Sequence, residues 1–179
     1  MTTQLATMMI PNSRPDEVPA SACRFIGEMD VVTNPADEGN VVPVRLIARS
    51  RSAINHWFWG KVAHDFDGLI RPPEGTAIPI DYCHDDQQIL GYANEFNALP
   101  EGLECVGMLV LSDQGGGRAR EVLYNWRHKV PYQSSIYFDA EQEIRIEEVE
   151  AGRTVIVNGQ PFDGPGLVIR QWKLRGVAI

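Results

Sequence analysis

The sequence has few cysteines and lacks a long apolar run. Its three cysteines, Cys23, Cys83 and Cys105, are far apart and include no Cys-x-x-Cys pair, so neither a disulfide framework nor a zinc knuckle is expected. No stretch approaches the roughly 20 consecutive apolar residues that cross a bilayer, and the N-terminus lacks the cationic start and apolar run of a signal peptide. We therefore expect an intracellular protein with no membrane partner.

An excess of positive charge is also missing. The chain has 16 Lys and Arg against 24 Asp and Glu, a formal net charge of −8. Because such a surface repels polyanions, we expect no nucleic-acid partner and favour a protein or peptide partner. With 179 residues, 44% of them hydrophobic, the chain is long enough for one compact domain. Residues 1–20 are polar and proline-containing and predict a mobile tail, which leaves residues 21–179 as the domain.

Short apolar runs separated by Gly, Pro, Asn and Asp predict a chain made mostly of strands. The expected strands cover residues 25–32, 41–48, 77–82, 89–96, 103–111, 134–138, 143–149, 154–157 and 166–179. Residues 118–129 differ, because their apolar side chains recur at helical spacing, and Asn158-Gly159 predicts a hairpin turn. These elements indicate a β-rich α+β fold, with a closed or partly closed β-barrel and helices outside it as the expected architecture.

Two polar residues at strand ends are candidates for chemistry. His84 follows the expected strand 77–82 and is expected to open a loop that contains Asp85 and Asp86, where an imidazole can act as a base near neutral pH. An ordinary turn histidine is the alternative. Ser134 and Ser135 begin a later apolar strand, and a serine hydroxyl becomes a nucleophile only when a base takes its proton. A pair of half-buried structural hydroxyls is the alternative there.

Other types of catalytic site receive less support from the sequence. No Gly-x-Ser-x-Gly motif is present, which excludes the nucleophile elbow of α/β-hydrolases. Cys83 lies next to His84, but neighbouring residues of a strand point to opposite faces, which disfavours a thiol nucleophile. A metal-dependent hydrolase is a further alternative. However, the histidines and carboxylates of this chain lack the spacing of a helical His-Glu-x-x-His motif. The candidate ligands would be His56, His64, Asp65, His84, Asp85 and Asp86. The fourth histidine, His128, is expected to be a solvated residue near the helix end.

Six segments in a fixed order carry a resemblance to a known family. They are VPVRLIARS (42–50), WGKVAHDFDG (59–68), IPIDYCHD (78–85), LGYAN (90–94), VPYQSSIYF (130–138) and RQWKLRGVAI (170–179). Through them the chain resembles, from about residue 41 to 179, the bacteriophage prohead proteases, whose fold is related to the herpesvirus capsid-maturation proteases. The family's strand ending in His-Asp matches His84-Asp85, and its Ser-Ile-x-Phe strand matches residues 135–138. The resemblance therefore selects Ser135, and not Ser134, as the nucleophile and His84 as its base.

The sequence departs from the family pattern at the expected third catalytic residue. Family members often have a glutamate in the last conserved strand, where this chain has Arg175-Gly176. The identity of the residue that orients His84 is therefore open, and Asp85 is the first choice. The other candidates are Asp86, His64, Asp65, Glu147 and Glu148. Herpesvirus-like relatives use a second histidine as the orienter and an arginine at the oxyanion, which makes Arg170 and Arg175 candidates for oxyanion binding.

The resemblance implies a serine endopeptidase that forms an acyl-enzyme and needs no cofactor or metal. Its expected substrates are the phage scaffolding protein, the scaffold-like segment of the major capsid protein and the protease itself, inside the procapsid in the host cytoplasm. The implied oligomer is a homodimer. The apolar end at Ile179 suggests a truncated or self-cleaved chain. A catalytically decayed scaffold or assembly protein is the main alternative.

Overall fold

The computed structural model describes residues 24–28, 40–111, 117–138 and 144–179. The expected tail (1–20), Cys23, residues 29–32 of the first expected strand and the start of the strand expected at 143 lie outside the described residues. Two compact units divide the described part of the chain. The first unit comprises Arg24, Arg51–Arg71 and Phe138–Leu174, and the second comprises Phe25–Ser50, Pro72–Tyr137 and Arg175–Ile179. The sequence pattern indicated one domain and contained no sign of this division.

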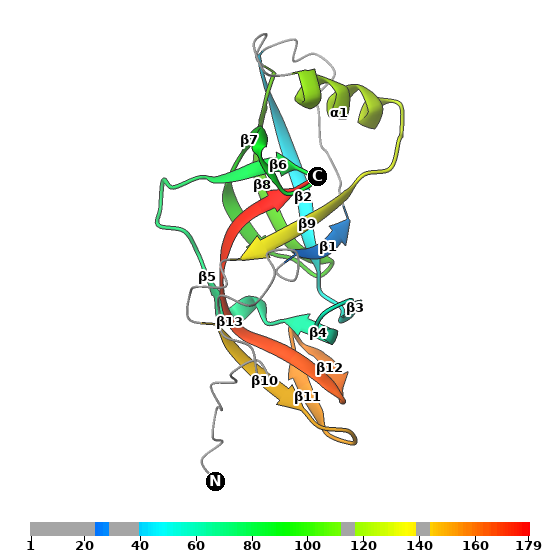
Figure 1. The fold of residues 1–179 in the computed structure, drawn as a ribbon. Coiled ribbons are helices and arrows are strands. Elements are labelled where there is room, and N and C mark those ends of the chain that lie inside the picture. The colour runs from blue at the N-terminus through cyan, green and yellow to red at the C-terminus, as the bar shows by residue number, and fades with distance from the viewer. Residues whose placement is uncertain (1–23, 29–39, 112–116, 139–143) are drawn as a thin grey trace. The chain divides into compact units, whose positions relative to one another are not determined.

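The second unit is built on one curved sheet. Its strands, in spatial order, are β1 (Arg24–Glu28), β9 (Gln133–Phe138), the end of β13 (Gly166–Ala178), β6 (Ile78–Tyr82), β7 (Asp85–Ala98), β8 (Gly102–Val110) and β2 (Val41–Ser50). Strands β6, β7, β8 and β2 pair antiparallel, whereas β13 pairs parallel with β6. Figure 1 shows this arrangement, with the single described α-helix, α1 (Gly117–Arg127), beside it.

Alternating hydrophobicity explains why these segments form strands that cover a core. In β2, the buried Val42, Val44 and Leu46 alternate with exposed residues, which is the pattern of a strand with one face on the core. Helix α1 buries its predicted apolar side, with Val122 fully buried. It also carries Arg118, whose guanidinium lies 4.5 Å from the centre of the Tyr82 ring. The β-rich α+β class predicted from the sequence is confirmed.

The sheet of the second unit does not close into a barrel through main-chain pairing. Among the described strands the order is a path with β2 at one end, not a ring. A side chain nevertheless links β9 to that end, because the buried Ser134 hydroxyl donates a 2.7 Å hydrogen bond to the Ile47 carbonyl on β2. The sheet is therefore curved enough to bring β9 within hydrogen-bond distance of β2. The expected closed barrel is not observed.

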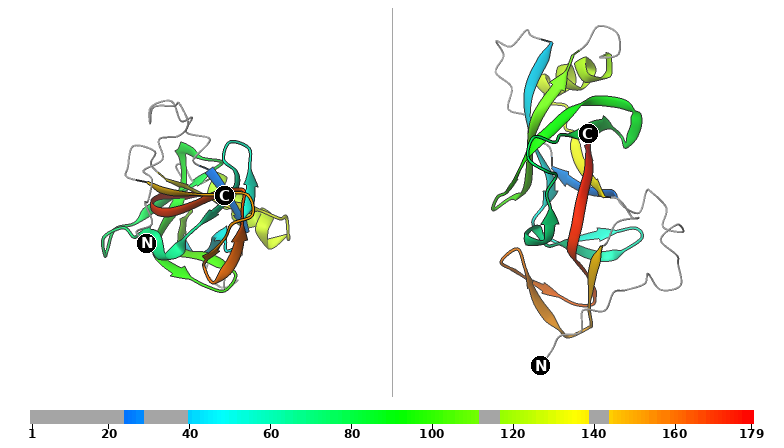
Figure 2. Two further views of the ribbon diagram at one scale, coloured as in Figure 1. Left: turned by 90° about the horizontal axis from the view of Figure 1, so that it is seen from below. Right: turned by 90° about the vertical axis from the view of Figure 1, so that its left-hand side faces the viewer.

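The first unit is a smaller β-structure around the first half of β13. There β13 pairs antiparallel with β10 (Arg145–Val149) and parallel with β4 (Gly60–His64) and β5 (Leu69–Ile70). The remaining elements are β3 (Ile54–His56), which pairs with β4, a short 3-10 helix (Phe66–Gly68), and the hairpin of β11 (Thr154–Val157) and β12 (Gln160–Asp163). The hairpin is clear in the right-hand view of Figure 2, in orange.

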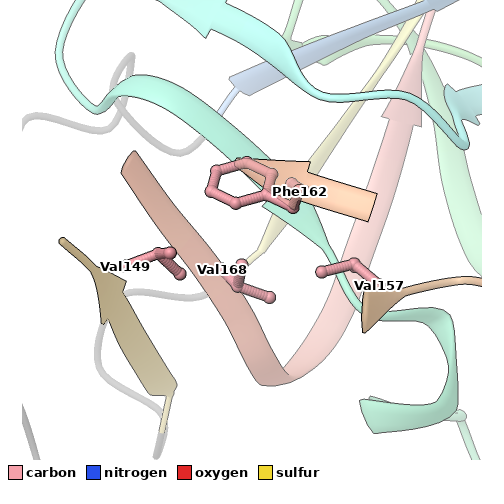
Figure 3. Close-up of a cluster of buried hydrophobic side chains, with 5 residues drawn as sticks. Val149, Val157, Phe162 and Val168 are labelled. Carbon is pink, nitrogen blue, oxygen red and sulfur yellow. The ribbon is translucent and has the colours of Figure 1, made fainter. Parts of the chain in front are cut away.

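A compact apolar cluster fills the centre of the first unit. Val149, Val157, Phe162 and Val168 each contribute a side chain that is at most 3% exposed, and Ala63 completes the cluster (Figure 3). Its members come from β10, β11, β12, β13 and β4, so the cluster holds five strands together. At roughly 1.5–3 kcal/mol for each large apolar side chain removed from water, this burial is a main source of the unit's stability.

Candidate active site

His84 lies in a tight turn between β6 and β7. Tyr82 pairs with Asp85, which leaves Cys83 and His84 as the two turn residues, with φ values of 56° and 61°. Two successive positive φ values are typical of a type I′ hairpin turn, where Asn and Gly are normally preferred. The prediction that His84 opens a loop is wrong, because β7 begins at Asp85. Cys83 is also not on a strand face opposite to His84, as was expected, since both residues are in the turn.

Main-chain hydrogen bonds fix this turn at its base. The Cys83 amide donates to the Ile179 carbonyl at 3.0 Å, and the Ile179 amide donates to the Asp81 carbonyl at 2.9 Å. In the pairing of β6 with β7, Tyr82 faces Asp85 but the neighbouring Asp81 faces Ile89, so the three residues 86–88 of β7 bulge out of the ladder. The irregular backbone expected here from the sequence therefore exists as a bulge inside a strand. Holding two non-glycine residues at positive φ costs about 1–2 kcal/mol each, and such strain is often found at functional sites.

Strand β9 separates its two serines onto opposite faces. Ser134, Ile136 and Phe138 are buried, whereas Ser135 and Tyr137 alternate with them and are half-buried. The Ser134 hydroxyl is committed to the Ile47 carbonyl. Strand geometry therefore leaves Ser135 as the hydroxyl on the more accessible face, in agreement with the choice made from the sequence motif.

The structure brings His84 and Ser135 together. The Nε2 atom of His84 lies 2.9 Å from the Oγ atom of Ser135, although 51 residues separate them in the sequence. This distance lies within the range of roughly 2.6–3.2 Å that a general base needs to take a proton from a nucleophile. Proton transfer from Ser135 to His84 requires the neutral His84 tautomer that carries its proton on Nδ1, so that Nε2 can accept the serine proton. The pair has the geometry of an activated serine.

Tyr137 contacts His84 directly, Asp81 contacts Tyr137, and neither residue was predicted from the sequence. The ring of Tyr137 contacts the His84 ring in a T-shaped arrangement, with 5.2 Å between centroids. Its hydroxyl donates a 2.6 Å hydrogen bond to Asp81, which is 1% exposed. Burial, the hydrogen bond to Asp81 and the charge of Asp81 raise the pKa of Tyr137, while the charge of Arg175 opposes the shift. A sequence signal for Tyr137 existed, because it lies two residues after Ser135 and so shares its face.

The first-choice orienter, Asp85, is engaged within its own strand. Its Oδ1 atom accepts from the Gln87 amide at 3.0 Å, and its Oδ2 atom accepts from the Gln88 side chain at 2.6 Å. The hydrogen bond from Gln88, followed by that from Gln87, lowers the pKa of Asp85. Asp86 is exposed in the bulge, and its charge contributes to the raised pKa of Tyr137.

The other candidate orienters belong to the first unit. His64 is buried, with its ring 5.0 Å from that of Trp172 and 6.0 Å from that of Phe138. Asp65 and Glu147 are both hydrogen-bonded to one arginine, Arg170, and Glu148 is exposed on β10. The residue that would orient His84 stays a prediction.

The two arginines proposed for oxyanion binding have different surroundings. Arg170 lies in the first unit, where its guanidinium donates to Glu147 and Asp65, each at 2.7 Å. Arg175 lies in the second unit, where it is the exposed residue of the last part of β13, and its charge lowers the pKa of Tyr137. Arg175 is therefore in the same unit as the Ser135–His84 pair and acts electrostatically on a residue that contacts His84.

The candidate metal ligands are not gathered into one site. His56 Nδ1 accepts from the amides of Phe58 and Trp59 at 3.2 and 3.3 Å, which gives it a structural partner. His128 is exposed near the end of α1, as expected, and its Nδ1 atom lies 2.7 Å from the Tyr124 carbonyl oxygen. Within the described ranges, no three His, Cys, Asp or Glu side chains are close enough together to hold a metal ion.

Comparison of the chain with protein-family models, curated proteins and solved structures finds no match. Among the described helices, none is long and apolar enough to cross a membrane. The function is therefore inferred from two sources: the geometry around Ser135 and the ordered sequence segments described above.

Proposed function

We propose that the protein is a serine endopeptidase in which Ser135 is the nucleophile and His84 the general base. The observation that carries this proposal is the 2.9 Å separation of Ser135 Oγ and His84 Nε2. A hydroxyl and an imidazole at this distance recur on unrelated folds that perform acyl transfer. The turn that holds His84 is strained and pinned by main-chain hydrogen bonds, which preorganises the base.

The reaction would proceed through an acyl-enzyme. Ser135 Oγ attacks the peptide carbonyl carbon while His84 Nε2 takes the hydroxyl proton, which gives a tetrahedral oxyanion. The C–N bond then breaks as His84 returns the proton to the leaving amine, and an ester remains on Ser135. A water molecule attacks this ester, again losing its proton to His84. The ester C–O bond breaks, the carboxylic acid product leaves, and Ser135 regains its proton.

Arg175 is the better of the two candidates for binding the oxyanion. It is exposed and belongs to the unit that carries Ser135. Arg170, in contrast, would have to release two carboxylates before it could act on a substrate. A cation near the developing oxyanion stabilises the transition state more than the ground state, which is the requirement for a faster reaction.

The proposed biological role is proteolysis during phage procapsid maturation in the host cytoplasm. This role is supported by the sequence segments that resemble prohead proteases. With it we propose a partly closed herpesvirus-protease-like barrel, a homodimer and self-cleavage. The proposed substrates are the scaffolding protein and the scaffold-like segment of the capsid protein. Confinement in a shell raises the effective concentration of enzyme and substrate, so even a slow protease would complete the processing.

The experiment that tests the role is co-expression with the scaffolding and capsid proteins, followed by gel analysis and intact mass measurement. We expect processing with the wild type and loss of processing with Ser135→Ala and with His84→Ala. Ser134→Ala is the matched control, because it removes a neighbouring hydroxyl from the other face of β9, and it should retain processing. Persistent processing by Ser135→Ala would reject the proposal, and loss of processing on addition of a chelator would favour a metal-dependent hydrolase. Absence of processing by the wild type would favour the decayed assembly protein.

A further inference from the structure

Ser135 and Tyr137 present their side chains on the same face of β9, and one imidazole contacts both. His84 Nε2 is 2.9 Å from the Ser135 hydroxyl, and the His84 ring meets the Tyr137 ring at an interplanar angle of 77°. A T-shaped contact restricts the tilt of both rings, because it is favourable only over a limited range of angles. The Tyr137 ring is therefore placed to limit rotation of the base away from the nucleophile.

Tyr137 is itself fixed at its far end. Its hydroxyl donates a 2.6 Å hydrogen bond to Asp81 Oδ2. Asp81 is 1% exposed, and a buried carboxylate is retained in a fold only when hydrogen bonds compensate for lost hydration. The main chain of Asp81 also accepts the Ile179 amide that braces the His84 turn. Asp81 therefore fixes both Tyr137 and the base of the turn.

The backbone of β13 also lies close to the Tyr137 ring. A Cβ atom added at Gly176 would overlap the ring and the hydroxyl of Tyr137. The absence of a side chain at this position lets the ring lie directly against β13. The position of the ring is thus set by Asp81 at the hydroxyl, by the close β13 backbone at Gly176 and by the main chain of β9.

We infer that Tyr137, anchored by Asp81, is the positioning residue that holds the His84 imidazole toward Ser135. This inference rests on the proposed function. Tyr137 acts through His84 and needs no contact with the substrate.

The test uses purified protein and a small fluorophosphonate probe, which reports the reactivity of a serine without a peptide substrate. The labelling reaction forms a bond between Ser135 Oγ and phosphorus and releases fluoride, while the base takes the proton. We expect Tyr137→Leu to lower the maximal labelling rate about a hundredfold, the usual effect of misplacing a catalytic group by about 1 Å, with an unchanged half-saturating concentration. Tyr137→Phe keeps the ring but loses the hydrogen bond to Asp81, and it should lower the rate about tenfold.

A second readout does not depend on activity. Long-range ¹H–¹⁵N correlation spectra report the tautomer and the order of the His84 ring, and Tyr137→Leu should replace one set of imidazole signals with averaged or multiple signals. Gly176→Ala should act in the same direction, because it displaces the Tyr137 ring without altering His84 or Ser135. Tyr124→Leu is the matched control, since Tyr124 is 62% exposed on α1, and it should behave as the wild type.

The outcomes separate this inference from the proposed function. If Ser135→Ala abolishes labelling while Tyr137→Leu keeps the wild-type rate and imidazole signals, the positioning role is overturned and the protease proposal stands. A lower melting temperature with an unchanged rate and spectrum would also overturn it, because the role would then be structural only. If labelling persists in Ser135→Ala, the proposed function fails, and the His84 spectra of the variants still decide whether Tyr137 orders the ring. Should Tyr137→Leu not fold, Tyr137→Phe and Gly176→Ala provide the same comparison.

Discussion

Replacing Cys83 with glycine tests the strained turn that carries His84. Cys83 has a φ of 56° and is exposed, so glycine would relieve a left-handed conformation with little loss of buried surface. A non-glycine residue in this region costs about 1–2 kcal/mol. Glycine also gains freedom in the unfolded chain, which offsets roughly 0.5–1 kcal/mol of that relief. The free energy of unfolding should therefore rise by about 0.5–1 kcal/mol in Cys83→Gly.

The assay is thermal unfolding followed by circular dichroism, with fluorophosphonate labelling measured on the same samples. For a domain of this size, 1 kcal/mol corresponds to roughly 2–4 °C, so the melting temperature should rise by about 1–4 °C. Cys83→Val is the matched control, because a β-branched residue is least tolerant of positive φ, and it should lower the melting temperature. Labelling should persist in Cys83→Gly, since the thiol has no catalytic role in the proposal. A fall in melting temperature with glycine, or loss of labelling, would refute this reasoning.

Three further predictions concern other parts of the structure. Ser134→Ala should lower the free energy of unfolding by about 1–3 kcal/mol in urea titrations, because it removes the hydroxyl that donates a hydrogen bond to the Ile47 carbonyl. An unchanged urea midpoint of unfolding would contradict a stabilising hydrogen bond between β9 and β2. Tyr137 should ionise well above its ordinary pKa of 10.0, so the stability gained from its bond to Asp81 is complete below that value and is lost as pH rises through the raised pKa. Its tyrosinate absorbance, obtained by subtracting a Tyr137→Phe titration, should be absent near pH 10. Phe162→Ala should cost about 3–5 kcal/mol in the first unit, measured by protection of its amides from hydrogen exchange, and full protection would contradict the role of the cluster in Figure 3.

Local sequence signals predicted much of the fold. The run of apolar residues in β2, the helical spacing in α1 and the Asn158-Gly159 turn each depend on neighbouring residues, and each prediction is confirmed. The short strands β3, β4 and β5 were missed, because runs of only two to five residues are too short to show a clear period. The pairing of β13 with strands of both units was also not predictable, since it depends on the order of strands in space.

In the candidate site, too, local sequence patterns were predictable and contacts between distant strands were not. The motif order identified His84 and Ser135, and the structure places them 2.9 Å apart. Asp81 and Tyr137 were missed because their hydrogen bond joins residues 56 positions apart, on strands that neighbour β13 from opposite sides. Composition and spacing contain no signal for such a contact, whereas a shared strand face, as for Ser135 and Tyr137, can be read from the period of two.

The most direct measurement for the central claim is the site of fluorophosphonate attachment, determined by peptide mass spectrometry of the labelled protein. The proposed Ser135–His84 pair predicts one adduct, on Ser135, that disappears in His84→Ala although the hydroxyl is still present. An adduct on Ser134, or an undiminished adduct on Ser135 in the absence of the His84 imidazole, would contradict it.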